Sequence, residues 1–187
     1  MNGPPESASM LWRRLDAPGH DACRLERTGE GWRLAGTAVF RQAGKPACLA
    51  YVVQCDSVFW ARRGEVVGWL GGRAVELRVA RSARGPWTMD GTSVPGLEAC
   101  LDLDLGFTPA TNMLALRRLA LEPGQEAEAP AAHLGVTGEL ARLPQRYARL
   151  SETEYAYEAP SVPFSASLEV DAAGFVRRYP GLWEREP

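Results

Sequence analysis

The stretch RAVELRVAR, at Arg73–Arg81, is the clearest guide to the fold of this chain, because its residues alternate in polarity. One face of the stretch carries Val75, Leu77 and Val79, and the other carries Glu76, Arg78 and Ala80. Successive side chains of a β-strand point to opposite faces of a sheet, so this period of two predicts a half-buried strand.

In the rest of the chain, similar alternating or β-rich patterns recur in short runs that are separated by Gly, Pro, Asp and Ser. We expect roughly a dozen strands at the spacing typical of sandwiches and barrels. Besides Arg73–Arg81, the expected strands are Asp21–Thr28, Trp32–Arg41, Leu49–Cys55, Val58–Arg63, Glu65–Leu70, Trp87–Met89, Leu101–Leu105, Leu116–Leu121, Gln145–Leu150, Thr153–Tyr157, Phe164–Val170 and Phe175–Tyr179. The expected exceptions are a helix at Thr111–Leu119, a helical turn or two near Ala129–Leu134, and a solvated loop over Glu122–Ala132.

The composition indicates one globular domain, since 45% of the 187 residues are hydrophobic and 24% are charged. The chain has 21 Lys and Arg residues and 23 Asp and Glu residues, so it has no net positive charge that would attract nucleic acid. Apolar stretches of about 18 residues are absent, which excludes a transmembrane helix. We expect residues 1–10 to be frayed, residues 11–187 to form a single β half-barrel domain, and the protein to be cytoplasmic because no secretory signal is recognisable.

So many strands in one domain must close into a barrel or curl, because a wide open sheet exposes edges and an apolar face. The fold class is therefore expected to be all-β and mainly antiparallel: a curled sheet or half-barrel with few short helices. A curled sheet with few helices leaves a cleft, and such clefts commonly hold apolar ligands. Six tryptophans supply core packing or an aromatic wall for sugar rings and acyl chains.

Two aspartates lie at alternating positions within CLDLDLGFTPATNMLALRRL, at Cys100–Leu119. On a strand, Asp102 and Asp104 would share one face about 7 Å apart. Carboxylates at such a distance could perform acid and base catalysis on a glycosidic bond. Pairing with Arg117 or Arg118 in an internal ion-pair network is the first expectation, however, because arginine binds carboxylates in a bidentate manner.

Other residues are candidates for ligand contact. Trp60 and Arg62 would project together from an unbroken strand, either as a cation–π pair or toward a ligand. Asn112 belongs to a turn whose polar groups could start a helix or bond sugar hydroxyls. The full set expected at or near the cleft is Trp60, Arg62, Asp102, Asp104, Asn112, Arg117 and Tyr157.

Conventional catalytic motifs are missing from the sequence. His20 and His133 have no motif beside them, and no nucleophile elbow, P-loop, dinucleotide fingerprint or zinc-protease motif occurs. The spacing of the four cysteines does not match a zinc site. We therefore expect no catalytic residues, no metal and no cofactor.

Five segments together resemble a known family. They are YVVQCDSVFWARR at Tyr51–Arg63, Trp87 with Asp90-Gly91, CLDLDLGFTPATNMLALRRL at Cys100–Leu119, QRYARL at Gln145–Leu150, and VDAAGFVRRYPGLW at Val170–Trp183. Through most of its length the chain is similar to the bacterial family named "Putative glycolipid-binding". The resemblance implies a half-barrel of antiparallel strands, similar to lipoprotein-localisation carriers, that binds a lipid or glycolipid. It implies no catalytic residues.

The leading hypothesis is a non-enzymatic protein that binds a glycolipid or another amphiphilic lipid in a hydrophobic cleft, in glycolipid metabolism or transport. One alternative is a hydrolase or isomerase that acts on a sugar-containing lipid through Asp102 and Asp104, which would require both carboxyl groups in a common pocket. Another is a protein-interaction scaffold that binds through an open sheet edge, which a filled interior would favour.

Overall fold

The computed structural model describes residues 6–82, 85–161 and 164–187, and in them the chain forms seventeen strands and one helix. The N-terminal strands are β1 (Ser7–Arg14), β2 (Gly19–Thr28), β3 (Gly31–Gln42), β4 (Lys45–Cys55), β5 (Ala61–Leu70), β6 (Arg73–Arg81), β7 (Trp87–Met89) and β8 (Thr92–Val94). The middle of the chain forms β9 (Asp102–Leu105), α1 (Asn112–Leu119), β10 (Glu126–Glu128), β11 (Ala131–Leu134) and β12 (Leu140–Leu143). The C-terminal strands are β13 (Arg146–Arg149), β14 (Glu154–Ala159), β15 (Phe164–Val170), β16 (Val176–Tyr179) and β17 (Trp183–Arg185).

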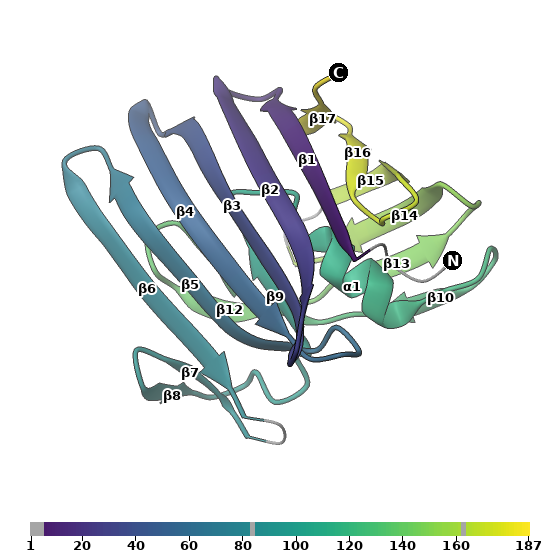
Figure 1. Ribbon diagram of the computed structural model, residues 1–187, viewed down its shortest axis with the longest axis horizontal. Helices are drawn as coiled ribbons and strands as arrows, with labels where there is room; N and C mark the ends of the chain where they lie inside the picture. The colour runs from purple at the N-terminus through teal and green to yellow at the C-terminus, as the bar shows by residue number, and fades with distance from the viewer. Residues whose placement is uncertain (1–5, 83–84, 162–163) are drawn as a thin grey trace.

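Fourteen strands form one sheet, in the order β10-β13-β14-β15-β16-β17-β1-β2-β3-β4-β5-β6-β7-β8. Two antiparallel meanders, β2–β8 and β13–β17, meet at β1. There, Trp12 is the register partner of both Asp21 on β2 and Arg185 on β17. The sheet curls, so that β13 and β14 run across the direction of β1–β6 (Figure 1). Within the described residues β8 and β10 remain its edges, so it is an open sheet, and the prediction of an all-β, mainly antiparallel single domain is confirmed.

Alternating side chains form the core. In β6, Val75, Leu77 and Val79 pack against or lie in the core, whereas Glu76 and Arg78 are exposed, as their pattern predicts. The longer strand β4 buries every second residue from Ala47 to Cys55. The period of two read from the sequence therefore decides which face of the sheet is buried.

A second, three-stranded sheet lies on the inner side of the large sheet, in the order β12-β11-β9 (Figure 1). Phe107, just after β9, stacks on Phe40 of β3 with ring centroids 6.0 Å apart. Gly64 of β5 is close-packed against Leu103, leaving no room for a Cβ. A continuous core thus occupies most of the space where the sequence predicted an open apolar cleft.

Several boundaries differ from expectation. Leu116–Leu121 is not a strand, because α1 continues to Leu119 and ends at Ala120, whose φ of 47° is left-handed. Ala129–Leu134 is not helical, since β11 occupies it, and β10 interrupts the expected loop. Val58–Arg63 and Glu65–Leu70 are not a pair of strands, because β5 runs unbroken from Ala61 to Leu70.

The N-terminus is also more ordered than expected. Ser7–Met10 belong to β1, where Met10 is buried, so the expectation of a frayed end is wrong for these residues. Residues 1–5 lie outside the described part of the chain. Pairing with β2 and β17 satisfies the backbone of β1, which is why this end of the chain is held in the sheet.

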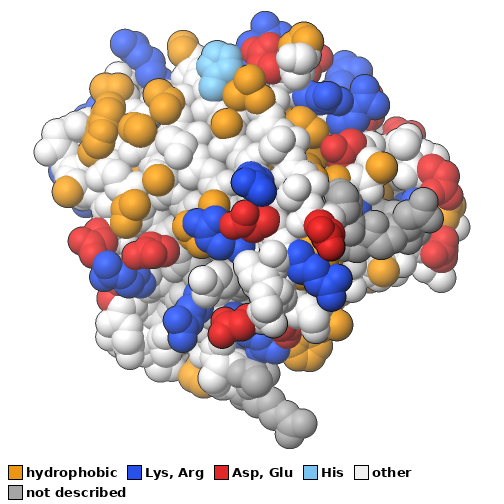
Figure 2. All heavy atoms as spheres, viewed as in Figure 1, with side chains coloured by type: hydrophobic (Ala, Val, Ile, Leu, Met, Phe, Trp, Pro, Cys, Tyr) orange, Lys and Arg blue, Asp and Glu red, His pale blue; other side chains and the backbone are white. Residues whose placement is uncertain are grey.

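The outer face of the large sheet carries an apolar area. Val39, Val67 and Trp69 are exposed there. Val39 and Trp69 both align with Cys48 of β4 across the sheet. Figure 2 shows hydrophobic side chains gathered over this part of the surface, at the upper left. The helix of the described residues is too short and too polar to cross a membrane.

Candidate functional site

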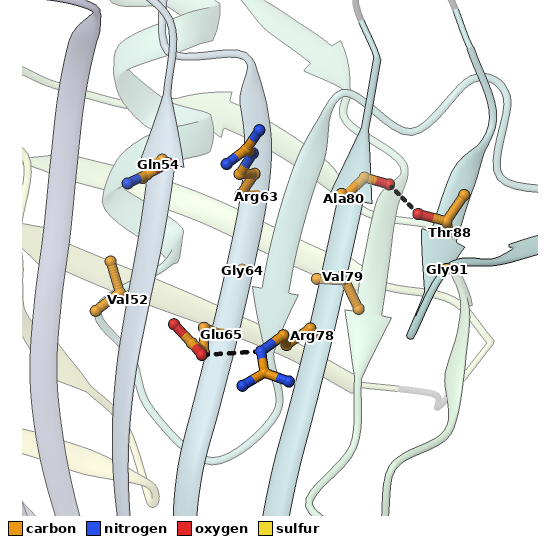
Figure 3. A pocket seen from close by; sticks show the side chains of 10 residues that line it. All are labelled: Val52, Gln54, Arg63, Gly64, Glu65, Arg78, Val79, Ala80, Thr88 and Gly91. Carbon is orange, nitrogen blue, oxygen red and sulfur yellow. Dashed lines mark hydrogen bonds and ion pairs between the residues drawn. The ribbon is translucent and has the colours of Figure 1, made fainter.

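A groove on the outer face runs between β4, β5 and β6 and encloses about 460 Å³ (Figure 3). Its walls include Val52, Gly64 and Ala80, and the Glu65 carboxylate accepts a 3.1 Å hydrogen bond from Arg78 across it. Both charged side chains are about half exposed and satisfy each other. This groove has no buried polar group that a ligand would need to pair.

A different pocket, of about 240 Å³, lies on the inner side between the small sheet, α1 and the C-terminal strands. We call it the polar–aromatic pocket. It is lined by Asp104, Leu105, Gly106, Thr108, Pro109, Asn112, His133, Leu143, Tyr157, Ala159, Phe164, Tyr179, Leu182 and Trp183. Its lining combines convergent polar groups with four aromatic rings, which is the usual composition of a small-molecule site.

A chain of hydrogen bonds connects three residues of the pocket lining, Asp104, Tyr157 and Tyr179. The side-chain amide of Gln145 donates to Asp104 Oδ2 at 2.5 Å and to Tyr157 Oη at 3.0 Å. Tyr157 is in turn hydrogen-bonded to Tyr179. Gln145 is buried and uses both of its N–H donors, so it holds a strand-borne carboxylate and a phenol in fixed positions.

Asp104 is the central acid of the pocket. Burial raises its pKa, while the neighbouring His133 and the hydrogen bond from Gln145 act in the opposite direction. His133 is the register partner of Asp104 in the parallel pair β9–β11, so their side chains leave the small sheet on the same face. Gly106 keeps this arrangement open, because a Cβ there would collide with His133 Nε2.

The aromatic wall comes from the C-terminal strands. Tyr157 packs on Tyr147 and Tyr179, with ring centroids 5.0 and 6.0 Å away, and Phe164 completes the group. Asn112, the first residue of α1, donates to Tyr147 Oη at 3.0 Å. Burial raises the pKa values of all three tyrosines, so their hydroxyls remain neutral donors and acceptors.

Behind the pocket lies a fully buried acid. Asp21 on β2 accepts hydrogen bonds from Tyr51 Oη, at 2.9 Å, and from Thr108, which itself lines the pocket. Burial raises the pKa of Asp21 to about 6, although both hydrogen bonds lower it. The hydrogen bonds among Asp21, Tyr51 and Thr108 therefore connect β2 and β4 to the loop before α1.

The structure brings together three of the seven residues expected at the site, since Asp104, Asn112 and Tyr157 line the polar–aromatic pocket. Asp102 lies on the same strand as Asp104 but does not line the pocket, and it forms a buried bidentate pair with Arg118 at 2.8 and 2.6 Å. Arg117 donates to the backbone carbonyls of residues 172 and 173. These two side chains therefore hold elements of the fold together.

Trp60 and Arg62 lie in another part of the molecule. The Arg62 guanidinium carbon is 5.4 Å from the Trp60 ring centroid, so the two side chains form a cation–π pair. The expected unbroken strand does not cause this pairing, because Trp60 precedes β5 and Arg62 lies at an irregularity in the pairing of β4 with β5. Arg62 also donates to Asp56 at 2.5 Å and borders a separate groove.

The expected set lacked Gln145, which is hydrogen-bonded to two lining residues, and it lacked His133, Tyr179 and Trp183 among other residues of the lining. Gln145 and the two aromatic residues do fall inside family-like segments. His133 had no signal beside it, because its partner Asp104 is supplied by another strand. Within the ranges that the structure describes, no cluster of His, Cys, Asp and Glu side chains is suited to a metal ion.

The fold and the pocket define a class of protein: an open, curled antiparallel sheet whose inner side carries a small polar and aromatic pocket. Residues 9–185 match the family described as "Putative glycolipid-binding", and the chain belongs to this family. The crystal structure of a DUF1089 family protein, PA1994 of Pseudomonas aeruginosa, is similar. It is 28% identical with a TM-score of 0.73, over 100% of this chain and 95% of that one. No curated protein matches the chain.

Proposed function

We propose that this protein is a non-enzymatic binding protein for a glycolipid or a related amphiphile, and that it takes the sugar headgroup into the polar–aromatic pocket. The main observation behind the proposal is that one pocket is lined by Asp104, Asn112, Tyr157 and Tyr179. Aromatic faces suit the C–H side of a sugar ring, and carboxylate, amide and phenol groups suit its hydroxyls. The family description is consistent with this ligand class.

The size of the pocket limits the kinds of ligand that it can hold. A volume of about 240 Å³ is below the roughly 300 Å³ at which pockets for drug-sized molecules begin, so a single sugar ring fits better than a whole lipid. The half-buried side chains of Leu143, Phe164 and Leu182 form part of the lining. They offer an apolar exit for the first methylenes of a chain, each of which contributes about 0.8 kcal/mol when buried.

The alternative of a hydrolase that uses two carboxylates has less support. Such an enzyme needs both acids at the scissile bond. Here Asp104 lines the pocket, whereas Asp102 is buried against Arg118 and does not line it. A scaffold role would instead use the open edges, β8 and β10, and would not depend on the pocket.

Calorimetry with n-octyl-β-glucoside below its micellar concentration tests the proposal, with octyl tetraoxyethylene as the matched amphiphile without a sugar. We expect the glucoside to bind more tightly. Ala159 is buried and lines the pocket, so Ala159→Leu should abolish binding by filling it. Tyr157→Phe should weaken binding about tenfold, the equivalent of one hydrogen bond.

Tyr155→Phe is the matched control, because Tyr155 lies on the same strand and its buried hydroxyl has no hydrogen-bond partner. Binding should be unchanged in this variant. Equal affinity for both amphiphiles, or wild-type affinity in Ala159→Leu, would contradict the proposal. Release of glucose during incubation, detected by mass spectrometry, would contradict its non-enzymatic part.

A further inference from the structure

A groove beside Arg62 encloses about 660 Å³. It lies between the β2–β3 turn, the end of β4, the start of β5 and the end of β6. It has no lining residue in common with the polar–aromatic pocket. Four arginines and two carboxylates line it, Arg33, Arg62, Arg63 and Arg81 with Glu30 and Asp56, so its local charge is positive in a chain of net charge −2.

A β-bulge places Arg62 in this groove. Gln54 of β4 aligns with Arg63, and Cys55 aligns with Ala61, which leaves Arg62 between them without a register partner. Bulges redirect a side chain in this way. One nitrogen of Arg62 donates to Asp56, but Nη1 is buried and has no hydrogen-bond partner.

Arg81, the last residue of β6, has no counter-charge among the described residues. It is only 9% exposed, and its Nη2 donates to the Glu98 carbonyl oxygen at 3.4 Å. Its Nε and Nη1 are buried without partners, and in the described part of the chain no carboxylate lies within ion-pair distance of it. Burial lowers the pKa of Arg81, and the charge of Arg62 lowers it further, so the two guanidinium groups repel each other.

Without a bound anion, this arrangement of guanidinium groups lowers the stability of the fold. A buried cation without a partner destabilises the fold, and its unpaired N–H groups add to that cost. The cost is offset if an anion binds between the guanidinium groups, because charge-assisted hydrogen bonds to Arg are among the strongest in proteins. Arg62 and Arg81 line the same groove, and the charge of Arg62 acts on Arg81. Two neighbouring guanidinium groups suit an anion with several oxygens better than a single planar carboxylate, which one Arg already matches.

We propose that Arg62 and Arg81 form a binding site for a phosphate group, either a free phosphate ester or the phosphate of a lipid headgroup. Arg63, exposed at the rim, adds positive charge that attracts the anion. The site is separate from the sugar pocket and does not depend on the proposed function.

Thermal unfolding of the full chain in increasing inorganic phosphate tests the site, at pH 7.5 and with chloride adjusted to constant ionic strength. Phosphate should raise the melting temperature of the wild type, because a ligand that binds only the folded state stabilises it. Arg81→Met should weaken phosphate binding at least tenfold. In chloride alone, Arg81→Met should melt no lower than the wild type, because the substitution removes an unpaired buried charge.

Arg78→Met is the matched control, since Arg78 lies on the same strand, is exposed, and is paired with Glu65 and Glu76. This variant should respond to phosphate as the wild type does. A wild-type phosphate response in Arg81→Met, or an equal loss in Arg78→Met, would overturn the proposal. If Arg81→Met does not fold, Arg62→Gln takes its place, with the same expected loss and the same criterion.

Flotation of vesicles separates the two sources of phosphate. Phosphatidylcholine vesicles with and without phosphatidic acid are compared, with the wild type and Arg81→Met. Binding that needs both phosphatidic acid and Arg81 supports the lipid source. A response to inorganic phosphate without vesicle binding supports a soluble phosphate ester. A wild type that responds to neither refutes the site.

Discussion

Replacing Asp21 with Asn should make the protein more stable at neutral pH. Asp21 is fully buried, no cation lies within ion-pair distance of it in the described residues, and burial raises its pKa from 3.8 to about 6. At pH values between about 3.8 and about 6, Asp21 keeps its proton in the folded state but has lost it in the unfolded state. The free energy of unfolding therefore falls as the pH rises from about 3.8 to about 6. A difference of roughly two pKa units corresponds to about 3 kcal/mol in full.

The assay is urea unfolding of the wild type and Asp21→Asn between pH 4 and pH 7.5. The amide is neutral throughout, so the advantage of the variant should grow by about 2 kcal/mol from the lower pH to the higher. Asp16→Asn is a control of opposite sign, because the hydrogen bond from Arg14 lowers the pKa of Asp16. Its effect should be destabilising at neutral pH and should disappear in acid. An advantage of Asp21→Asn that is constant with pH would refute the reasoning.

Two further changes test the packing around β9. Arg118→Met leaves Asp102 buried without its partner and should lower the free energy of unfolding, measured in urea, by roughly 3–5 kcal/mol. Adding Asp102→Leu should recover most of this loss. A loss below about 1 kcal/mol would show that water reaches Asp102. Gly64→Ala forces a Cβ against Leu103 and should cost about 1–3 kcal/mol. Gly72→Ala, where nothing lies within 4 Å, should be close to neutral, and equal costs at both positions would contradict the packing argument.

The secondary structure was predictable where the pattern was local. The alternation in Arg73–Arg81 and the turn residues around it are enough to place β6. The same reasoning failed for Leu116–Leu121, because a short apolar run fits either a helix end or a strand. It also overlooked the three-residue β17, whose strand pairing comes from β1 and β16 rather than from any pattern of its own.

The candidate site was predictable only in part. Asp104 and Asn112 stood out because polar residues interrupt an apolar segment, and Tyr157 lies on an expected strand. Their partners did not stand out. Gln145 lies 41 positions from Asp104 along the chain, and only the folding of β13 and β14 beside the small sheet brings its amide to that carboxylate.

The sequence by itself determined the all-β class, the buried face of the long strands, and the family resemblance, because these depend on neighbouring residues and on local motifs. The tertiary structure alone decided that β1 joins the two meanders, that the small sheet and α1 fill the inner side, and that Arg81 has no carboxylate partner within the part of the chain that the structure describes. Such features depend on pairings between distant segments, and the local period of a strand does not specify which other strand lies beside it.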